Sequence, residues 1–132
     1  MPSHLTNQQL SSLRRQLQQR LAVLREDIRQ ALLQSEDESY IELAGRVHDA
    51  EEESVADLLV DVNFAMIDLH VQEIRDIEAV LLRMDQGVYG LCTDCGTSIE
   101  YARLEAYPTA KRCFSCQRKH EQTYALAGHT KL

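Results

Sequence analysis

The four cysteines of this chain form two matched pairs, Cys92-x-x-Cys95 and Cys113-x-x-Cys116, with 17 residues between the pairs. This spacing is typical of a four-cysteine zinc site. Each C-x-x-C turn points two thiolates at a common centre, and two such turns complete a tetrahedron with Zn–S distances of about 2.3 Å. Four thiolates leave no open coordination position, so we expect one structural Zn²⁺ rather than a catalytic one.

The alternative interpretation of these cysteines is a set of free thiols or a redox dithiol pair. The cations Lys111 and Arg112 favour thiolates, so a metal-free state would be open to oxidation. The first residues lack a basic segment followed by an apolar stretch, and we therefore expect an unexported, cytoplasmic protein. In that setting metal binding is favoured over disulfides, and the apolar runs are too short to span a bilayer.

The amino-terminal third has the pattern of one long amphipathic helix over residues 7–34. Thr6 followed by Gln9 predicts a capping box at its start. The apolar residues after it recur at steps of three and four. They are Leu10, Leu13, Leu17, Leu21, Leu24, Ile28 and Ala31 or Leu32. Such a helix spans about 42 Å at 1.5 Å per residue, so it needs a second long helix against which to bury its apolar stripe.

Residues 49–84 offer that second helix, with apolar residues again at helical spacing. They are Val55, Leu59, Val62, Met66, Leu69, Ile74, Ile77, Leu81 and Met84. Between the two helices, residues 35–48 show little periodicity and predict a loop or an irregular turn. We therefore predict a mainly α fold: a long antiparallel coiled-coil hairpin, a small four-cysteine zinc-finger module and a C-terminal helix from Phe114 to Ala127.

Charge is distributed unevenly along this predicted hairpin. Residues 36–61 carry a series of carboxylates against the single cation Arg46. The acids are Glu36, Asp37, Glu38, Glu42, Asp49, Glu51, Glu52, Glu53, Asp57 and Asp61. The predicted organisation is residues 1–85 as amino-terminal segment and hairpin, with an acidic tip at about 35–54, and residues 86–132 as zinc finger and C-terminal helix. The acids that begin the second helix are either a solvated capping cluster or a partner-binding tip.

The overall composition disfavours nucleic-acid binding and catalysis. Fourteen Lys and Arg residues face 21 Asp and Glu residues, a formal net charge of -7, so diffuse attraction to a phosphate backbone or an anionic membrane is not expected. After residue 100 the chain is locally basic. Nucleophile-elbow, P-loop and dinucleotide-binding motifs are lacking, so we predict a protein that is not an enzyme.

The residues around the cysteines resemble a known family. The stretch from Gly87 to Gly96 reads G-x-Y-G-x-C-x-x-C-G, and Arg103 to Ala110 reads R-L-x-A-x-P-x-A before the second cysteine pair. Together with Ile99, this pattern resembles the zinc finger of the DksA/TraR family of bacterial RNA polymerase regulators, over about residues 85–120. The two long helices upstream are compatible with the coiled-coil hairpin of DksA-like members.

This resemblance implies a factor that binds bacterial RNA polymerase rather than promoter DNA. In such a factor the coiled coil enters the secondary channel and its acidic tip approaches the catalytic centre. DksA-like tips carry a D-x-x-D-x-A pattern, and counting back from the finger places Asp49, Glu52 and Ser54 at those positions. The first Asp is kept, Glu52 replaces the second, and Ser54 replaces Ala. A Glu reaches one methylene further, which alters contacts tuned to Asp.

The resemblance also bears on the alarmone ppGpp, with which DksA-like proteins often act. Several basic positions that DksA uses for ppGpp correspond here to Asp76, Tyr107 and Gln117. Because these replacements remove charge-assisted hydrogen bonds, we predict a weak ppGpp response, or none, at this site. The alternative function is a zinc-dependent protein-interaction adaptor, or a thiol and zinc redox sensor, that does not act on polymerase.

Overall fold

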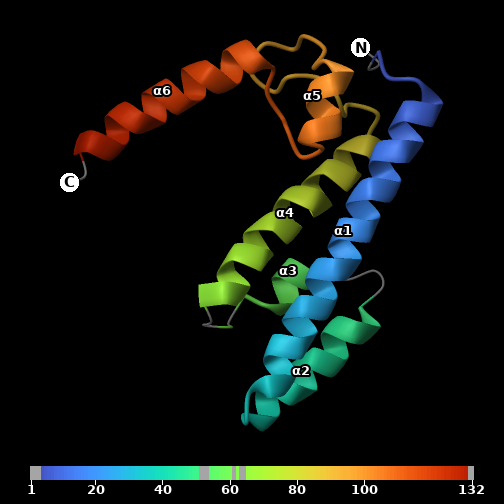
Figure 1. Ribbon diagram of the computed structural model, residues 1–132, viewed down its shortest axis with the longest axis vertical. Helices are drawn as coiled ribbons and strands as arrows, with labels where there is room; N and C mark the ends of the chain where they lie inside the picture. Colours follow the sequence, from blue (N-terminus) through green and yellow to red (C-terminus); the bar gives the residue numbers. More distant parts are fainter. Residues whose placement is uncertain (1–3, 51–53, 61, 63–64, 131–132) are drawn as a thin grey trace. The chain divides into compact units, whose positions relative to one another are not determined.

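The chain is helical through most of its length (Figure 1). The computed structural model describes residues 4–50, 54–60, 62 and 65–130. The helices are α1 (Asn7–Gln34), α2 (Glu38–Asp49), α3 (Val55–Leu58), α4 (Ala65–Asp85), α5 (Tyr101–Ala106) and α6 (Phe114–Thr130). Within those ranges, extended pairing is limited to an isolated antiparallel bridge between Leu91 and Ser98. The predicted mainly α fold is confirmed, including the C-terminal helix.

Helix α1 has the predicted bounds, and its first turn shows why. The Thr6 N–H donates to Gln9 Oε1 at 3.0 Å, and the Gln9 N–H donates to Thr6 Oγ1 at 3.1 Å. This reciprocal capping box satisfies two backbone donors that an α-helix leaves without partners. The predicted apolar stripe is buried along the helix at Leu13, Leu17, Leu24, Ile28 and Leu32.

The second arm of the hairpin differs from the prediction of one helix over residues 49–84. Helix α2 ends at Asp49, because Ala50 takes an extended conformation with ψ of 108°. Ser54 then caps the short helix α3, and α4 begins only at Ala65. The predicted loop at residues 35–48 was also wrong over most of its length, because Asp37 caps α2 by accepting from the Ser39 N–H at 2.9 Å.

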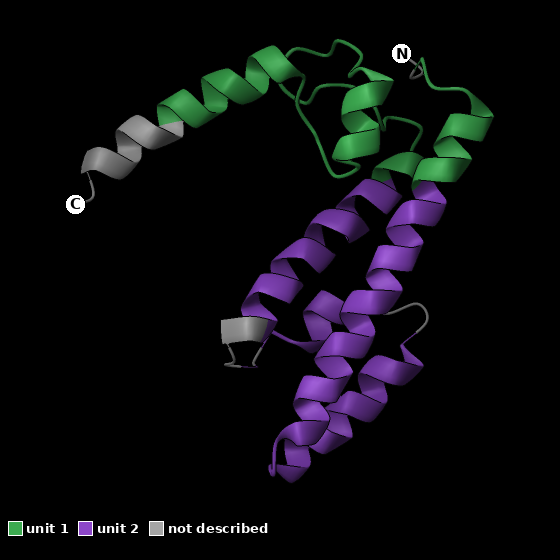
Figure 2. Cartoon of the chain, viewed as in Figure 1, with its two compact units in different colours: residues 1–13, 83–132 green, residues 14–82 purple. Residues whose placement is uncertain are grey.

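The chain divides into two compact units, residues 14–82 and residues 1–13 with 83–132 (Figure 2). In the unit of residues 14–82, α1 and α4 run in opposite directions (Figure 1). Helix α2 is bound to α1 through Arg25, and α3 contacts α2. A bidentate ion pair joins the long helices, with Arg20 donating to both carboxylate oxygens of Glu73. The core comes from all four helices. It contains Leu17, Leu24, Ile28, Leu32, Ala44, Val47, Val55, Ala56, Leu59, Ile67, Ile74, Ile77 and Val80.

One residue of the predicted seam on α4 lies elsewhere than expected. Leu69 is 76% exposed, and Ile67 takes the buried place in that turn. The side chain of Met66 lies outside the described residues. The buried positions Ile67, Ile74 and Ile77 follow steps of seven and three, which is the heptad pattern of a helix that packs along one stripe.

The unit of residues 1–13 and 83–132 holds the cysteine region. Among its described residues, the buried side chains are Leu13, Met84, Tyr89, Cys92, Ile99 and Leu104. This is a small apolar core for a segment of its length, and small domains of this kind usually rely on a metal or disulfides for stability. The predicted domain boundary at residue 85 stays a prediction. In the described part of the chain, no helix combines the length and the apolar character that crossing a membrane requires.

Candidate functional site

The first cysteine pair sits in a tight hairpin turn. The Cys92 N–H donates to the Thr97 carbonyl at 2.8 Å, and the Gly96 N–H returns to the Cys92 carbonyl at 3.0 Å. Gly96 has a φ of 77°, a left-handed conformation that favours glycine because it has no Cβ. The turn therefore brings Cys95 back beside Cys92.

The second cysteine pair lies at the start of α6. Cys113 precedes the helix and Cys116 falls in its first turn. The Cys116 N–H donates to Cys113 Sγ at 3.4 Å, and the Gln117 N–H donates to the Cys113 carbonyl at 2.9 Å. These bonds hold the second pair at the positive end of the helix dipole.

Two contacts bring these turns together. The Thr93 N–H donates to the Lys111 carbonyl at 2.8 Å. Arg112 donates from Nε to Asp94 Oδ2 at 3.0 Å, and the side chain of Arg112 is only 17% exposed. Each bond joins a residue inside the first C-x-x-C to a residue just before the second.

The result is a cluster in which the sulfur atoms of Cys92, Cys95, Cys113 and Cys116 all lie within 4.8 Å of one another. Cys92 is buried, Cys95 is exposed and the other two are half-buried. The separation suits four ligands around one ion, and the donor set of four soft sulfurs suits zinc. The residues present therefore fit a closed, structural zinc centre with no place for a substrate.

The protonation of the sulfurs also favours a cation at their centre. Burial tends to raise the pKa of Cys92, but the N–H groups of Cys113, Cys95 and Asp94 lower it to about 6. The Thr97 hydroxyl, 2.9 Å away, lowers the pKa of Cys95. The pKa of Cys116 is raised to about 12, because Cys116 shares hydrogen bonds with the sulfurs of Cys113 and Cys95. Without a cation, Cys116 keeps its proton. A bound Zn²⁺ makes four thiolates compatible.

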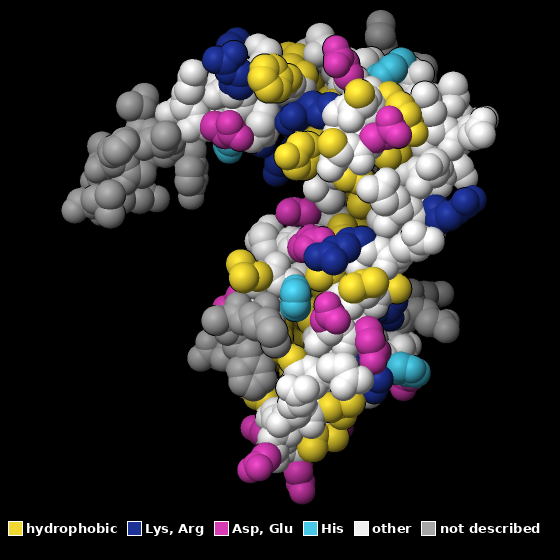
Figure 3. Space-filling model, in the orientation of Figure 1, with side chains coloured by type: hydrophobic (Ala, Val, Ile, Leu, Met, Phe, Trp, Pro, Cys, Tyr) yellow, Lys and Arg dark blue, Asp and Glu magenta, His cyan; other side chains and the backbone are white. Residues whose placement is uncertain are grey.

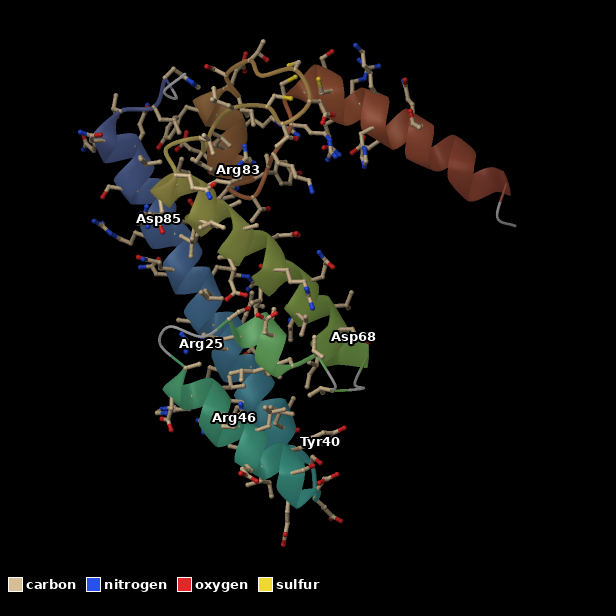
Figure 4. The ribbon with its side chains drawn as sticks, turned by 180° about the vertical axis from the view of Figure 1, so that it is seen from behind. Arg25, Tyr40, Arg46, Asp68, Arg83 and Asp85 are labelled. Carbon is tan, nitrogen blue, oxygen red and sulfur yellow. The ribbon has the colours of Figure 1, made fainter. Side chains whose placement is uncertain are left out.

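The loops that carry the four cysteines are held by hydrogen bonds from side chains to backbone carbonyls. Tyr89 is 2% exposed, and its hydroxyl donates to the Pro108 carbonyl at 2.9 Å. Arg103 donates from Nε to the Arg112 carbonyl at 3.2 Å. At the end of α4, Arg83 donates to the Leu91 carbonyl at 2.8 Å (Figure 4). These bonds set the course of the loops that lead into both cysteine pairs.

The predicted acidic tip residues are described only in part. Asp49 ends α2 with a side chain that is 82% exposed, paired with His48 Nδ1 at 3.0 Å. Ser54 caps α3, and Glu52 lies outside the described residues. The turn from α1 to α2 is formed by residues 35–37, so Asp49 lies at the opposite end of α2 from that turn (Figure 1). Acidic side chains gather at the turn itself, where Glu36, Asp37 and Glu38 are exposed (Figure 3).

The three positions compared with the ppGpp contacts of DksA also have defined surroundings. Asp76 is exposed on α4 and accepts from Gln72 Nε2 at 3.3 Å. Tyr107 and Gln117 both line a cavity of about 360 Å³ in the cysteine unit. Tyr107 is 64% exposed, with the Arg103 guanidinium 5.9 Å from its ring centre.

Sequence reasoning missed the residues that act around the sites rather than in them. Thr97 donates to a cysteine sulfur, and Asp94 with Arg112 ties the two turns together. Thr97 lies two residues beyond Cys95, a place from which a hydroxyl reaches back to the sulfur, and this spacing was the available signal. The Asp94–Arg112 pair spans 18 residues and left no local pattern.

This fold and this site define a class of protein in which a four-cysteine zinc finger is joined to long helices. Residues 87–122 match the family model of the prokaryotic dksA/traR C4-type zinc finger. The RNA polymerase-binding transcription factor DksA of Caulobacter vibrioides is 34% identical over 90 residues, which cover 68% of this chain and 58% of the relative. Residues 87–122 of this protein are therefore a zinc finger of the DksA/TraR family, and the similarity to DksA continues into the residues before them.

Further similarities extend beyond the finger. General stress protein 16O of Bacillus subtilis is 33% identical over 87 residues, covering 62% of this chain and 53% of the relative. The structure of transcription factor DksA2 from Pseudomonas aeruginosa aligns with a TM-score of 0.62 and 23% identity, over 92% of this chain and 90% of that chain. The fold is therefore shared with DksA2. The chain spans a little over half the length of the Caulobacter and Bacillus relatives.

Proposed function

We propose that this protein is a cytoplasmic, non-enzymatic transcription regulator that binds bacterial RNA polymerase through the secondary channel, without sequence-specific DNA binding. The observation that carries the proposal is the 90-residue similarity to a relative named as an RNA polymerase-binding transcription factor. Those 90 residues exceed the finger at 87–122, so the likeness includes part of the helical region. The net charge of -7 adds support, because it disfavours DNA as the main partner.

In this proposal Cys92, Cys95, Cys113 and Cys116 each supply one thiolate to a single structural zinc. The support is the mutual distance of their sulfurs and the donation of the Thr97 hydroxyl and backbone N–H groups to them. The zinc holds the two turns of the finger together and carries out no chemistry.

The polymerase-facing residues in this proposal are Asp49, Glu52 and Ser54. Asp49 is supported by its exposure and by the acidic character of the surrounding sequence. A carboxylate exposed in this way is accessible to a basic or metal-containing surface of a partner. We further propose a weak ppGpp response, because Asp76, Tyr107 and Gln117 offer no cation to a polyphosphate.

Competition tests the proposal directly. The zinc-loaded protein is added to bacterial RNA polymerase carrying a labelled secondary-channel factor, and displacement is followed together with the lifetime of promoter complexes. The tip variant is Asp49→Asn with Glu52→Gln. The matched control is Asp27→Asn with Asp68→Asn, which removes the same charge from exposed positions of α1 and α4.

Displacement with a lifetime effect that the tip variant loses and the control keeps supports a working regulator. Displacement without a lifetime effect leaves channel binding standing and overturns the role of the tip. A protein that displaces nothing refutes the polymerase proposal and favours the adaptor or redox-sensor alternative. Reversible zinc release on mild oxidation would then distinguish the sensor from the adaptor.

A further inference from the structure

The C-terminal end of α2 is held by a side chain from another helix. The guanidinium of Arg25, on α1, donates from Nη2 to the carbonyls of Val47 and Ala50 (Figure 4). The last carbonyls of a helix have no partner within it, and a cation there also opposes the negative end of the helix dipole. Arg25 therefore fixes the end of α2 that carries Asp49.

A second polar contact fixes the start of α3. The Ser54 hydroxyl donates to Glu78 Oε1, on α4, at 2.9 Å. Ser54 Oγ also accepts from the Asp57 N–H at 3.3 Å, so Ser54 caps α3 while it is hydrogen-bonded to α4. Arg25 and Glu78 thus reach residues 50 and 54 from two different long helices.

The apolar packing of these helices does not depend on the two contacts. Helix α2 is anchored by the buried side chains of Ala44 and Val47, and α3 by those of Val55 and Ala56. The side chain of Asp49, in contrast, is exposed and has no apolar packing of its own. Its direction is set by the backbone at the end of α2, which is where Arg25 binds, and by the contact with His48 Nδ1 at 3.0 Å.

We propose that Arg25 and Glu78 are positioning residues, which hold residues 50 and 54 so that the Asp49 carboxylate and the Ser54 region present a fixed geometry to the partner. This inference rests on the proposed function. It predicts a separation of two properties: occupancy of the channel depends on the whole unit, whereas the effect on promoter complexes depends on the direction of Asp49.

The test compares removal of each contact with its conservative replacement. Arg25→Met removes the donor and Glu78→Leu removes the acceptor. Arg25→Lys keeps a donor, and Glu78→Gln keeps an acceptor. Arg46→Met is the control, since it removes a cation from an exposed position of α2. Each full-length, zinc-loaded variant is measured for displacement of the labelled channel factor, for promoter-complex lifetime and for thermal unfolding.

We expect Arg25→Met and Glu78→Leu to displace the factor as the unaltered protein does, but to lose about fivefold or more of the lifetime effect, because Glu78→Leu removes one hydrogen bond and Arg25→Met removes two. The conservative variants should restore the effect, and Arg46→Met should keep it. Lifetime effects equal to those of the unaltered protein overturn the inference alone. Parallel losses of displacement and melting temperature in both contact variants also overturn it, because they indicate a structural role.

If Arg25→Met fails to fold, Glu78→Leu decides the question, because its contact involves a single hydroxyl. Failure of the unaltered protein to displace the channel factor is a different result. It refutes the proposed function, and the positioning role with it, whereas normal displacement with insensitive variants refutes only the positioning role.

Discussion

Replacing Tyr89 by Phe removes one hydroxyl from the core of the zinc-finger unit and leaves the ring in place. The ring is 2% exposed, and its hydroxyl donates to the half-buried Pro108 carbonyl at 2.9 Å. A neutral hydrogen bond of this kind contributes about 0.5–1.5 kcal/mol net, and water can partly replace the lost donor at Pro108. We therefore expect Tyr89→Phe to cost about 1 kcal/mol near neutral pH.

The same residue gives the unit a specific sensitivity to alkali. Burial raises the pKa of Tyr89 above its ordinary value of 10.0. The folded protein therefore keeps the phenol proton at a pH where the unfolded chain loses it. The stabilisation is fully present below pH 10.0 and is lost as pH rises towards the higher pKa of the folded state. For one proton, the free energy of unfolding falls by up to about 1.4 kcal/mol per pH unit in this range.

Phe has no proton to lose, so the two proteins must respond differently. The stability of the unaltered protein should fall towards that of Tyr89→Phe and meet it at about pH 11. The assay is denaturant unfolding of both zinc-loaded proteins, followed by circular dichroism over this pH range, with zinc content measured as a control. Curves that stay parallel through the alkaline range would refute the reasoning, as would equal stability near neutral pH.

Three further predictions concern the metal, the core and a surface ion pair. Cys92→Ser should melt residues 87–122 first and lower zinc content, since structural zinc is worth about 10–16 kcal/mol to small domains; unchanged calorimetry and stoichiometry would contradict this. Leu24→Ala should cost about 2–5 kcal/mol in denaturant unfolding, while Val23→Ala, at a 49% exposed position of the same helix, should stay within about 0.5 kcal/mol; similar costs would disprove the placement of the buried stripe. The Arg20 hydrogen bond lowers the pKa of Glu73, so the advantage over Glu73→Gln should be present above pH 4.5 and vanish as pH falls through the lower folded pKa. That advantage should not exceed about 0.5 kcal/mol, since both side chains are well exposed; a difference independent of pH in acid titrations would rule the pairing out.

The parts of the fold that sequence reasoning predicted correctly depend on local signals. Helix α1 combines a capping box at Thr6 and Gln9 with an uninterrupted apolar stripe, so its bounds follow from neighbouring residues. The cysteine cluster was equally accessible, because the spacing within each C-x-x-C and the positive-φ Gly96 determine a local turn.

The break in the second arm of the hairpin was marked in the sequence only by weak signals, and the helical spacing of the apolar residues competed with them. Asp37 and Ser54 are ordinary helix caps, and each could have marked the start of a separate helix. A helical repeat through residues 49–84 masked them, because apolar spacing continues across a break when short helices share one core. Leu69 was misplaced for the same reason. The contacts of Arg25 and Glu78 join residues more than 20 positions apart, and no local pattern encodes them.

The position of the second cysteine pair gives α6 an electrostatic dependence on metal. Helix α6 has no acidic residue in its first turn, where a carboxylate would ordinarily balance the helix dipole. Four thiolates around one divalent ion leave an anionic cluster at that place. The 17 residues of α6 are close to the length at which an isolated helix is only marginally stable in water. The helix content of the C-terminal segment should therefore rise and fall with zinc occupancy, so this helix content reports how much zinc is bound.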